Sequence, residues 1–244
     1  MKNDRRRPAR GRPQPGKPAR KPAAKKPVVK KSVAKKPTPG PAPQPVAEEP
    51  RTFRLGVIPG ATPGKWIDAW KQRMPHVDLE VVPISFADQR AAVGELDAAL
   101  VRLPVERADD LHVISLYDEV PVVVASAESH LMAAEELTAA DLDGEVLITP
   151  RDDVLGPLDL PTVAPKFPAL ATTEDAVATV ATGVGVVIVP MSLARLHHRK
   201  DADYRPLADG PTSTVALAWR REHTTPDVET FVGIVRGRTA NSSR

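Results

Sequence analysis

The stretch FRLGVIPG, residues 53–60, decides the fold, because it reads as a short buried strand that stops at a Pro-Gly pair. Thr62-Pro63 then predicts the start of a helix, with Thr62 as the N-cap and proline in the first helical position. Apolar residues recur at helical spacing until Pro75 ends the segment: Trp66, Ile67, Trp70 and Met74.

The same alternation of strand and helix continues down the chain. Residues 79–82 predict a second strand, and Ser85-Phe86-Ala87-Asp88 predicts a capping box that opens a short helix ending at Gly94. Residues 96–101 predict a third strand. This β-α-β-α-β order predicts an α/β fold with a parallel sheet covered by helices on both faces.

The pattern beyond residue 110 predicts more strands and two more helices. The predicted helices begin at Thr172-Thr173, with Gly183 closing the helix in a left-handed conformation, and at Thr225-Pro226. The predicted strands are 112–116, 120–125, 146–148, 184–189 and 215–220.

The first 50 residues differ in charge from the rest. They hold 15 Lys and Arg against 3 Asp and Glu, whereas residues 51–244 hold 19 against 28. They also hold 12 of the 27 prolines and no aromatic residue. Such a segment cannot bury enough apolar surface to offset the entropy of ordering, so residues 1–50 are predicted to be a disordered basic tail that favours a polyanion.

Composition excludes several classes of protein. The absence of cysteine removes disulfide frameworks, thiolate metal sites and cysteine nucleophiles. The basic N-terminus is not followed by the apolar segment of a secretory signal, and no apolar run reaches membrane-spanning length. We therefore expect a cytoplasmic protein with no membrane partner.

Six stretches together resemble the effector-binding domain of LysR-type transcriptional regulators, and the resemblance spans about residues 51–236. It implies two Rossmann-like lobes of the type II periplasmic-binding-protein kind. The stretches are LGVI at 55–58, GELDAALVRLP at 94–104, SHL at 129–131, AADL at 139–142, VATGVGVVIVP at 180–190 and LAWR at 217–220.

The resemblance sets the expected domain bounds. The first lobe is predicted at about 51–122 and 214–238, the second at about 123–213, and residues 239–244 are predicted to be a disordered C-terminus. Two departures from the family accompany this match. The sequence lacks the winged helix-turn-helix that precedes such a domain, with the basic tail in its place. Segment 149–171 also carries five prolines where the family has a helix.

Ligands of open α/β sheets bind beyond the carboxyl ends of the strands, near helix N-termini that favour anions. Arg102 is the predicted counter-charge, since its guanidinium can bind a carboxylate bidentately. The resemblance implies a small organic anion as effector and a homodimer as assembly. The predicted ligand-binding residues are Gly60, Ala61, Thr62, Ser85, Phe86, Arg102, Thr149, Pro150, Thr172, Thr173 and Pro190.

Simpler roles are open for several of these residues. Thr62, Ser85 and Thr173 could only cap helices. Arg102 could pair with a surface acid, Glu106 or Asp109, instead of a ligand.

No residue pattern indicates catalysis, a cofactor or a metal. Neither Ser126 nor Ser129 lies in a Gly-x-Ser-x-Gly elbow, and no glycine-rich phosphate loop is present. His197-His198 is favoured as a solvated basic turn, and Trp66 and Trp70 as core residues. We therefore predict a protein that is not an enzyme.

The tail contains an AT-hook-like motif at Arg10-Gly11-Arg12-Pro13, in which glycine lies flat in a narrow minor groove and two arginines follow its floor. Non-specific polyanion binding is the broader alternative, and a tail that folds back on the acidic body is another. The flanking basic residues predicted to help are Arg5, Arg6, Arg7 and Lys17.

Together these features predict a ligand-responsive transcriptional regulatory protein whose tail supplies nucleic-acid affinity. The alternative is a stand-alone small-molecule-binding module that acts through a protein partner without binding DNA.

Overall fold

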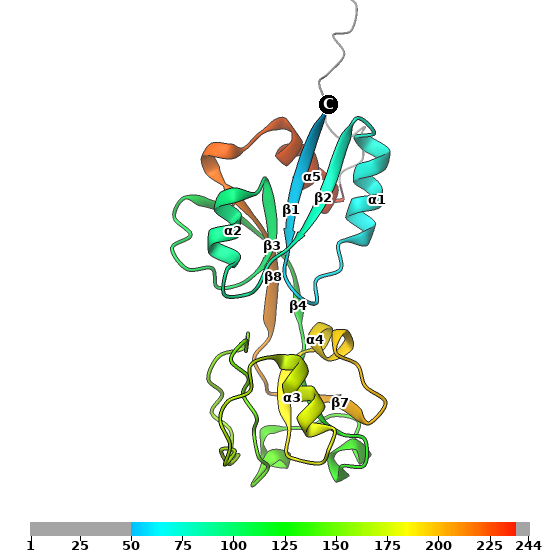
Figure 1. Cartoon of the computed structure of the whole chain (residues 1–244), viewed down its shortest axis with the longest axis vertical. Coiled ribbons are helices and arrows are strands. Elements are labelled where there is room, and N and C mark those ends of the chain that lie inside the picture. The colour runs from blue at the N-terminus through cyan, green and yellow to red at the C-terminus, as the bar shows by residue number, and fades with distance from the viewer. Residues whose placement is uncertain (1–49, 238–244) are drawn as a thin grey trace, which may run out of the picture. The chain divides into compact units, whose positions relative to one another are not determined.

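The computed structural model describes residues 50–237, which form two lobes, each built on its own sheet (Figure 1). The predicted AT-hook-like motif, nearly all of the predicted tail and the predicted disordered C-terminus lie outside the described residues. The predicted domain bounds stay predictions.

The first lobe is built on a five-stranded sheet. Its strands lie in the order β2-β1-β3-β8-β4. β1 pairs in parallel with β2 and β3, whereas β8 runs antiparallel between β3 and β4. The predicted parallel sheet therefore holds only for the first three strands. Their bounds are β1 Arg51–Val57, β2 Val77–Pro83, β3 Ala98–Arg102, β4 Leu111–Glu119 and β8 Ser213–Arg220.

Helices cover both faces of this sheet, as predicted. α1 (Gly64–Arg73) and α5 (Pro226–Val235) pack on one face, and α2 (Gln89–Glu95) on the other. The rings of Phe53, Trp70 and Phe231 pack together between α1, α5 and β1, with centroids 4.7–5.9 Å apart. The Trp70 indole N–H donates to Val77 O at 2.9 Å. Trp70 is thus a core residue, and Trp66 packs at the margin of the same core.

The second lobe has a three-stranded antiparallel sheet. Its strands β5 (Pro121–Ser126), β6 (Val187–Pro190) and β7 (Ala202–Pro206) lie in the order β6-β5-β7. One face is covered by α3 (Thr173–Val180) and α4 (Met191–Leu196). The other is covered by the 3₁₀ turns η1 (His130–Ala133) and η2 (Ala139–Leu142). A third 3₁₀ turn, η3 (Arg221–His223), joins β8 to α5 in the first lobe.

Two chain crossings join the lobes. β4 passes through Val120 directly into β5, and residues 207–212 return from β7 to β8. Because both crossings are short, the end of β4 and the start of β8 lie at the boundary between the lobes (Figure 1).

Two local predictions were wrong. The predicted strand at 146–148 makes only isolated bridges, to Val163 and Val186. Pro161 and Pro165 interrupt the segment around Val163, which cannot continue the pairing. Thr62 does not cap α1. The N-cap is Pro63, and no side chain caps this terminus.

Two other predictions were confirmed. Segment 149–171 contains no helix. Gly183 follows α3 with φ +90°, in the left-handed region that an L side chain rarely adopts.

The N-terminus of α5 provides a direct test of helix capping. Thr225 Oγ1 accepts a hydrogen bond from Val228 N at 3.3 Å, and Pro226 follows in the first turn. We expect Thr225→Ala to lower the free energy of unfolding by about 0.5–2 kcal/mol in urea denaturation, because a helix N–H loses its acceptor. Thr230→Ala, the same change at a partly exposed position of α5 where the hydroxyl only donates to Pro226 O, should stay within about 0.5 kcal/mol of the wild type. Equal effects of the two changes would contradict the capping role.

Among residues 50–237, no helix is long and apolar enough to cross a membrane.

Candidate functional site: the cleft between the lobes

A cleft of about 270 Å³ opens between the two lobes and brings together five of the predicted ligand-binding residues: Ser85, Phe86, Arg102, Thr172 and Thr173. The first lobe contributes the ends of β1 and β3 and the turn before α2. The second lobe contributes the start of α3, the loop after residue 150 and one side of α4. The other lining residues are Ile58, Pro59, Asp152, Val154, Glu174, Leu193, Leu196 and His197.

The N-terminus of α3 forms one wall of the cleft. Thr172 is the N-cap, and its Oγ1 accepts a hydrogen bond from Asp175 N at 3.1 Å. Thr173 follows as the first helical residue and is 2% exposed. Its hydroxyl donates to Asp152 Oδ1 at 2.9 Å and is therefore not a cap. Thr172 thus both caps α3 and lines the cleft. Thr173 links the loop after residue 150 to α3 through its hydrogen bond to Asp152.

Ser85 lies on the opposite wall, in the turn that precedes α2. Its Oγ accepts from Asp88 N at 3.0 Å and donates to Asp88 Oδ2 at 2.6 Å. α2 begins only at Gln89, so Ser85 organises this turn and not the helix itself. Phe86, half-buried, supplies an apolar surface beside it.

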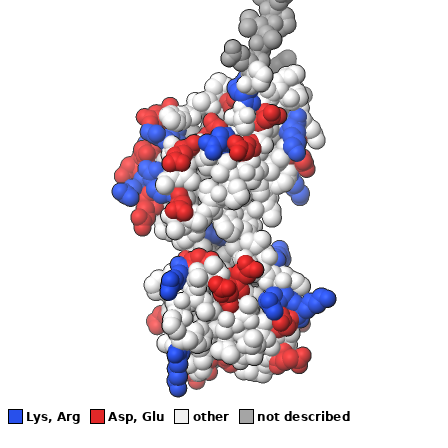
Figure 2. Space-filling model, in the orientation of Figure 1, with Lys and Arg blue, Asp and Glu red and all other residues white. Residues whose placement is uncertain are grey.

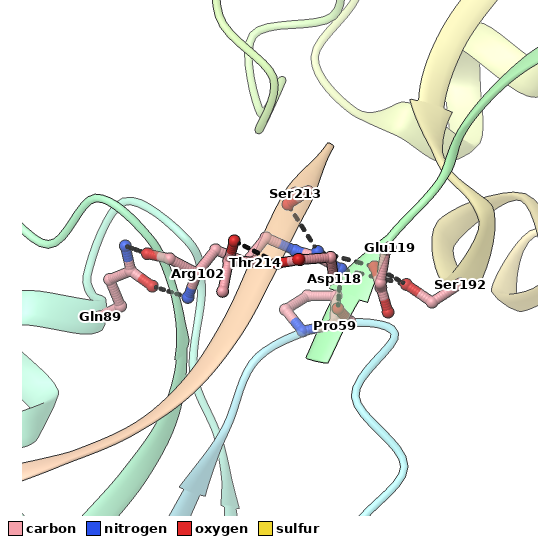
Figure 3. A network of polar contacts seen from close by, with 8 residues as sticks. All are labelled: Pro59, Gln89, Arg102, Asp118, Glu119, Ser192, Ser213 and Thr214. Atoms are coloured by element: carbon pink, nitrogen blue, oxygen red, sulfur yellow. Dashed lines mark hydrogen bonds and ion pairs between the residues drawn. The ribbon is translucent and has the colours of Figure 1, made fainter. Parts of the chain in front are cut away.

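Arg102 is buried at the boundary between the lobes, at 1% exposure, and its charge is already paired (Figure 3). Its Nη1 donates to Glu119 Oε2 at 2.7 Å and to Ser213 Oγ at 2.9 Å. Its Nη2 donates to Ser192 Oγ at 3.0 Å, and Ser192 Oγ donates in turn to Glu119 Oε2 at 2.7 Å. This group of Arg102, Glu119, Ser192 and Ser213 is called the interlobe network below.

The interlobe network changes the predicted role of Arg102. Its partner is neither Glu106 nor Asp109 but Glu119, at the end of β4, where the chain crosses between the lobes. Since the Glu119 carboxylate neutralises it, Arg102 cannot serve as a free counter-charge for an anion. Its role in the structure is to link β3 and β4 of the first lobe to α4 of the second.

Two further residues hold this region in place. Gln89 is 5% exposed, and its side chain exchanges two hydrogen bonds with the backbone of Arg102, at 2.8 and 3.0 Å. Gly60 has φ +85°, and a Cβ at this position would collide with the Ser192 hydroxyl. The loop after β1 therefore approaches α4 closely only because it carries glycine there.

A second and larger pocket, of about 600 Å³, is lined in part by Glu119 and Ser192 of the interlobe network. The predicted residues Gly60, Ala61 and Thr62 line this pocket and not the cleft, together with Tyr117, Asp118, Glu119, Val120, Met191, Ser192, Arg195 and Leu196. Burial, followed by the charge of Glu119, raises the pKa of Tyr117, while Arg102 opposes that rise.

The other predicted ligand-binding residues lie apart from the cleft. Thr149 and Pro150 line a separate pocket of about 10 Å³, which is too small for an organic ligand. Pro190 is buried at the end of β6. Asp153 lies beside this small pocket, and burial raises the pKa of its carboxyl, although hydrogen bonds from backbone N–H groups oppose the rise.

Ser126 and Ser129, the two serines weighed for nucleophilic chemistry, both accept hydrogen bonds from nearby backbone N–H groups. Ser129 Oγ caps η1 by accepting from Leu131 N, and Ser126 Oγ accepts from Glu128 N. No group of three His, Asp or Glu side chains in this part of the chain could hold a metal ion.

Several residues of this region were not predicted from the sequence, among them Glu119, Asp152, Gln89 and Ser192. Glu119 and Asp152 each sit in an acidic pair typical of a solvated loop. Only the position of Glu119 between two adjacent strands could have indicated a crossing between lobes. Ser192 and Gln89 carry no local signal, because their partners are far away in sequence.

Comparison with known proteins identifies the class of this fold. The model of the LysR substrate binding domain matches residues 47–240, and the chain belongs to this family. Among solved structures, the BenM effector-binding domain with its effector benzoate superimposes with a TM-score of 0.63 at 20% identity, covering 77% of this chain and 91% of that one. The reduced OxyR regulatory domain of Pseudomonas aeruginosa gives a TM-score of 0.58 at 24% identity, covering 77% and 98%. These two structural similarities show that residues of this chain adopt the fold of an effector-binding domain.

Curated relatives are regulators. The Hca operon transcriptional activator HcaR of Escherichia coli is 28% identical over 80% of this chain and 71% of its own length. The HTH-type transcriptional regulator CatR of Pseudomonas putida is 31% identical over 58% of this chain and 52% of its own length. The chain thus matches only part of each regulator.

Proposed function

We propose that this protein is a ligand-responsive transcriptional regulatory protein, not an enzyme, whose effector binds in the cleft between the lobes. The observation that carries the proposal is the meeting of Ser85 and Phe86 of one lobe with Thr172 and Thr173 of the other around one cavity. A ligand that touches both walls stabilises one relative position of the lobes, because its binding energy differs between the open and closed arrangements.

A small organic anion is the proposed effector class. The first turn of α3 has N–H groups without helical partners and a partial positive charge, which favour a carboxylate. The apolar lining, which includes Phe86, Val154 and Leu193, suits a hydrocarbon skeleton. The BenM domain that shares this fold was solved with benzoate, a compound of this class.

A panel of small carboxylates tests the cleft by differential scanning fluorimetry. A ligand at about 100 times its Kd adds about 2.7 kcal/mol of stability, which raises Tm by roughly 5–10 °C for a chain of this size. Phe86→Ala should reduce the shift, because it removes part of the cleft wall. The matched control is Phe167→Ala, since Phe167 packs in the second lobe without lining the cleft. Equal loss in both variants, or no shift with any carboxylate, would count against the proposal.

The tail is proposed to supply nucleic-acid affinity. Its support is the net charge of residues 1–50 and the Arg10-Gly11-Arg12 motif. If about ten phosphates are engaged, the slope of log K against log salt is about −9 on duplex DNA.

Fluorescence anisotropy of the intact chain and of residues 51–244 alone, on A·T-rich and G·C-rich duplexes over a salt series, measures this affinity. We expect binding only with the tail present, and loss of an A·T preference in Arg10→Ala/Arg12→Ala. Absence of binding at low salt would instead favour the second candidate, a stand-alone small-molecule-binding module that acts through a protein partner. We propose a homodimer in either case.

A further inference from the structure

The charges that line the cleft are not those of a site for a simple anion. Three side chains that are charged at neutral pH line it, Arg102, Asp152 and Glu174, together with the imidazole of His197. The Arg102 charge is neutralised by Glu119 at 2.7 Å. No Lys, Arg or His among residues 50–237 forms an ion pair with Asp152 or Glu174. With His197 neutral, the free charges of the lining are therefore two carboxylates, which repel a lone anion and attract a cation.

These carboxylates come from two separate segments and meet at the start of α3. Glu174 lies in the first turn of the helix, where an acid commonly offsets the helix dipole. Asp152 comes from the loop after residue 150 and is fixed by the 2.9 Å hydrogen bond from Thr173, whose side chain is buried. Figure 2 shows acidic side chains gathered on the second lobe at the cleft end of α3.

Both kinds of partner for a doubly charged head group are thus present at one end of the cleft. Asp175 N–H already donates to Thr172 Oγ1, so the N–H groups of Thr173 and Glu174 are the first-turn donors of α3 for a carboxylate. Asp152 and Glu174 are acceptors for an ammonium group. The rest of the lining is mostly apolar: Ile58, Pro59, Phe86, Val154, Leu193 and Leu196.

We propose that the effector is a zwitterion with a carboxylate and an ammonium group on neighbouring carbon atoms, as in an α-amino acid, and with an apolar side chain. This inference rests on the proposed function and narrows its anionic effector to one that also carries a cation. The carboxylate accepts from the first-turn N–H groups of α3, the ammonium donates to Asp152 and Glu174, and the side chain lies toward Phe86. Each charge of the ligand then lies against protein groups of the opposite sign. The ligand carboxylate faces the helix terminus, and the ammonium group faces Asp152 and Glu174.

Two sets of matched compounds test the zwitterion on the intact chain by isothermal titration calorimetry. Phenylalanine is compared with 3-phenylpropanoate, which lacks the amine, and with 2-phenylethylamine, which lacks the carboxylate. Leucine is compared with 4-methylpentanoate and 3-methylbutylamine in the same way. We expect at least one amino acid to bind about tenfold or more tightly than both of its singly charged analogues.

Variants assign the ammonium partners. Asp152→Asn/Glu174→Gln should weaken amino-acid binding about tenfold, while binding of the amine-free carboxylate stays equal or becomes tighter. Asp175→Asn is the matched control, because Asp175 is an exposed acid in the same turn of α3 that does not line the cleft. It should leave amino-acid binding unchanged. Thermal unfolding of each variant verifies that it is folded.

Three results would overturn the zwitterion. If the amine-free carboxylate binds as tightly as its amino acid, the effector is a plain anion, and the proposed function stands without this inference. If the carboxylate-free amine binds as tightly, the α3 terminus has no role in charge recognition. If none of the six compounds binds below about 10 mM, the inference fails, and the broader carboxylate panel decides the proposed function separately.

Discussion

Replacing Arg102 with alanine is expected to lower the free energy of unfolding by about 3–5 kcal/mol, because it leaves the Glu119 carboxylate buried without its cationic partner. The two side chains are only 1% and 9% exposed, so the Glu119 carboxylate is poorly solvated once the guanidinium is removed. Ser192 and Ser213 also lose hydrogen-bond partners. Urea denaturation at constant pH gives the change in unfolding free energy directly.

A surface ion pair provides the control for this prediction. Arg54 and Glu80 lie 3.3 Å apart with side chains 46% and 56% exposed, so Arg54→Ala should cost no more than about 1 kcal/mol. Replacing both members of the buried pair by apolar residues, Arg102→Met/Glu119→Leu, should cost less than Arg102→Ala alone, because no charge then remains unpaired. Equal costs for Arg102→Ala and Arg54→Ala would contradict the interlobe network.

Gly185→Ala is the second change with a large expected effect. Gly185 has φ +70°, and a Cβ there would collide with the carbonyl oxygen of Val146. That carbonyl accepts a hydrogen bond from Val186 N at 2.8 Å, which joins the 146–148 segment to β6. The left-handed backbone costs about 1–2 kcal/mol for an L side chain, and forcing the segments apart adds roughly 1–3 kcal/mol.

Gly183→Ala separates these two contributions. Gly183 also has positive φ, at +90°, but a Cβ there would meet nothing within 4 Å. We therefore expect only the conformational cost at position 183 and the conformational plus steric cost at position 185, measured by the urea midpoint. A larger loss of stability at position 183 would contradict the close approach at position 185.

The sequence predicts elements well where local pattern and burial agree. The first three strands and their helices follow from hydrophobic periodicity, and the starts of α3 and α5 follow from the capping threonines 172 and 225. β7 was missed, because Asp203 and Arg205 interrupt any apolar run and its pairing partner β5 lies far away in the sequence. β8 was predicted as a strand, but its place in the sheet was not. Its position between β3 and β4 depends on contacts with segments that are far away in the sequence.

The candidate site was predicted in part for the same reason. Helix starts and strand ends are local features, so Ser85, Phe86, Thr172 and Thr173 were predicted near the cleft, although only Thr172 caps a helix. Loop paths are not local, and Gly60, Ala61 and Thr62 therefore turn toward the larger pocket instead of the cleft. The partner of Arg102 was missed because Glu119 resembles any exposed acid until the crossing of β4 into β5 buries it.

A crystal structure of the intact chain with the small molecule that most raises its Tm shows whether the effector binds in the cleft between the lobes. We expect electron density for that molecule in the 270 Å³ cleft, in contact with Phe86 on one wall and with Thr173 on the other. Density for it only in the 600 Å³ pocket, beside Tyr117 and Arg195, would contradict the account.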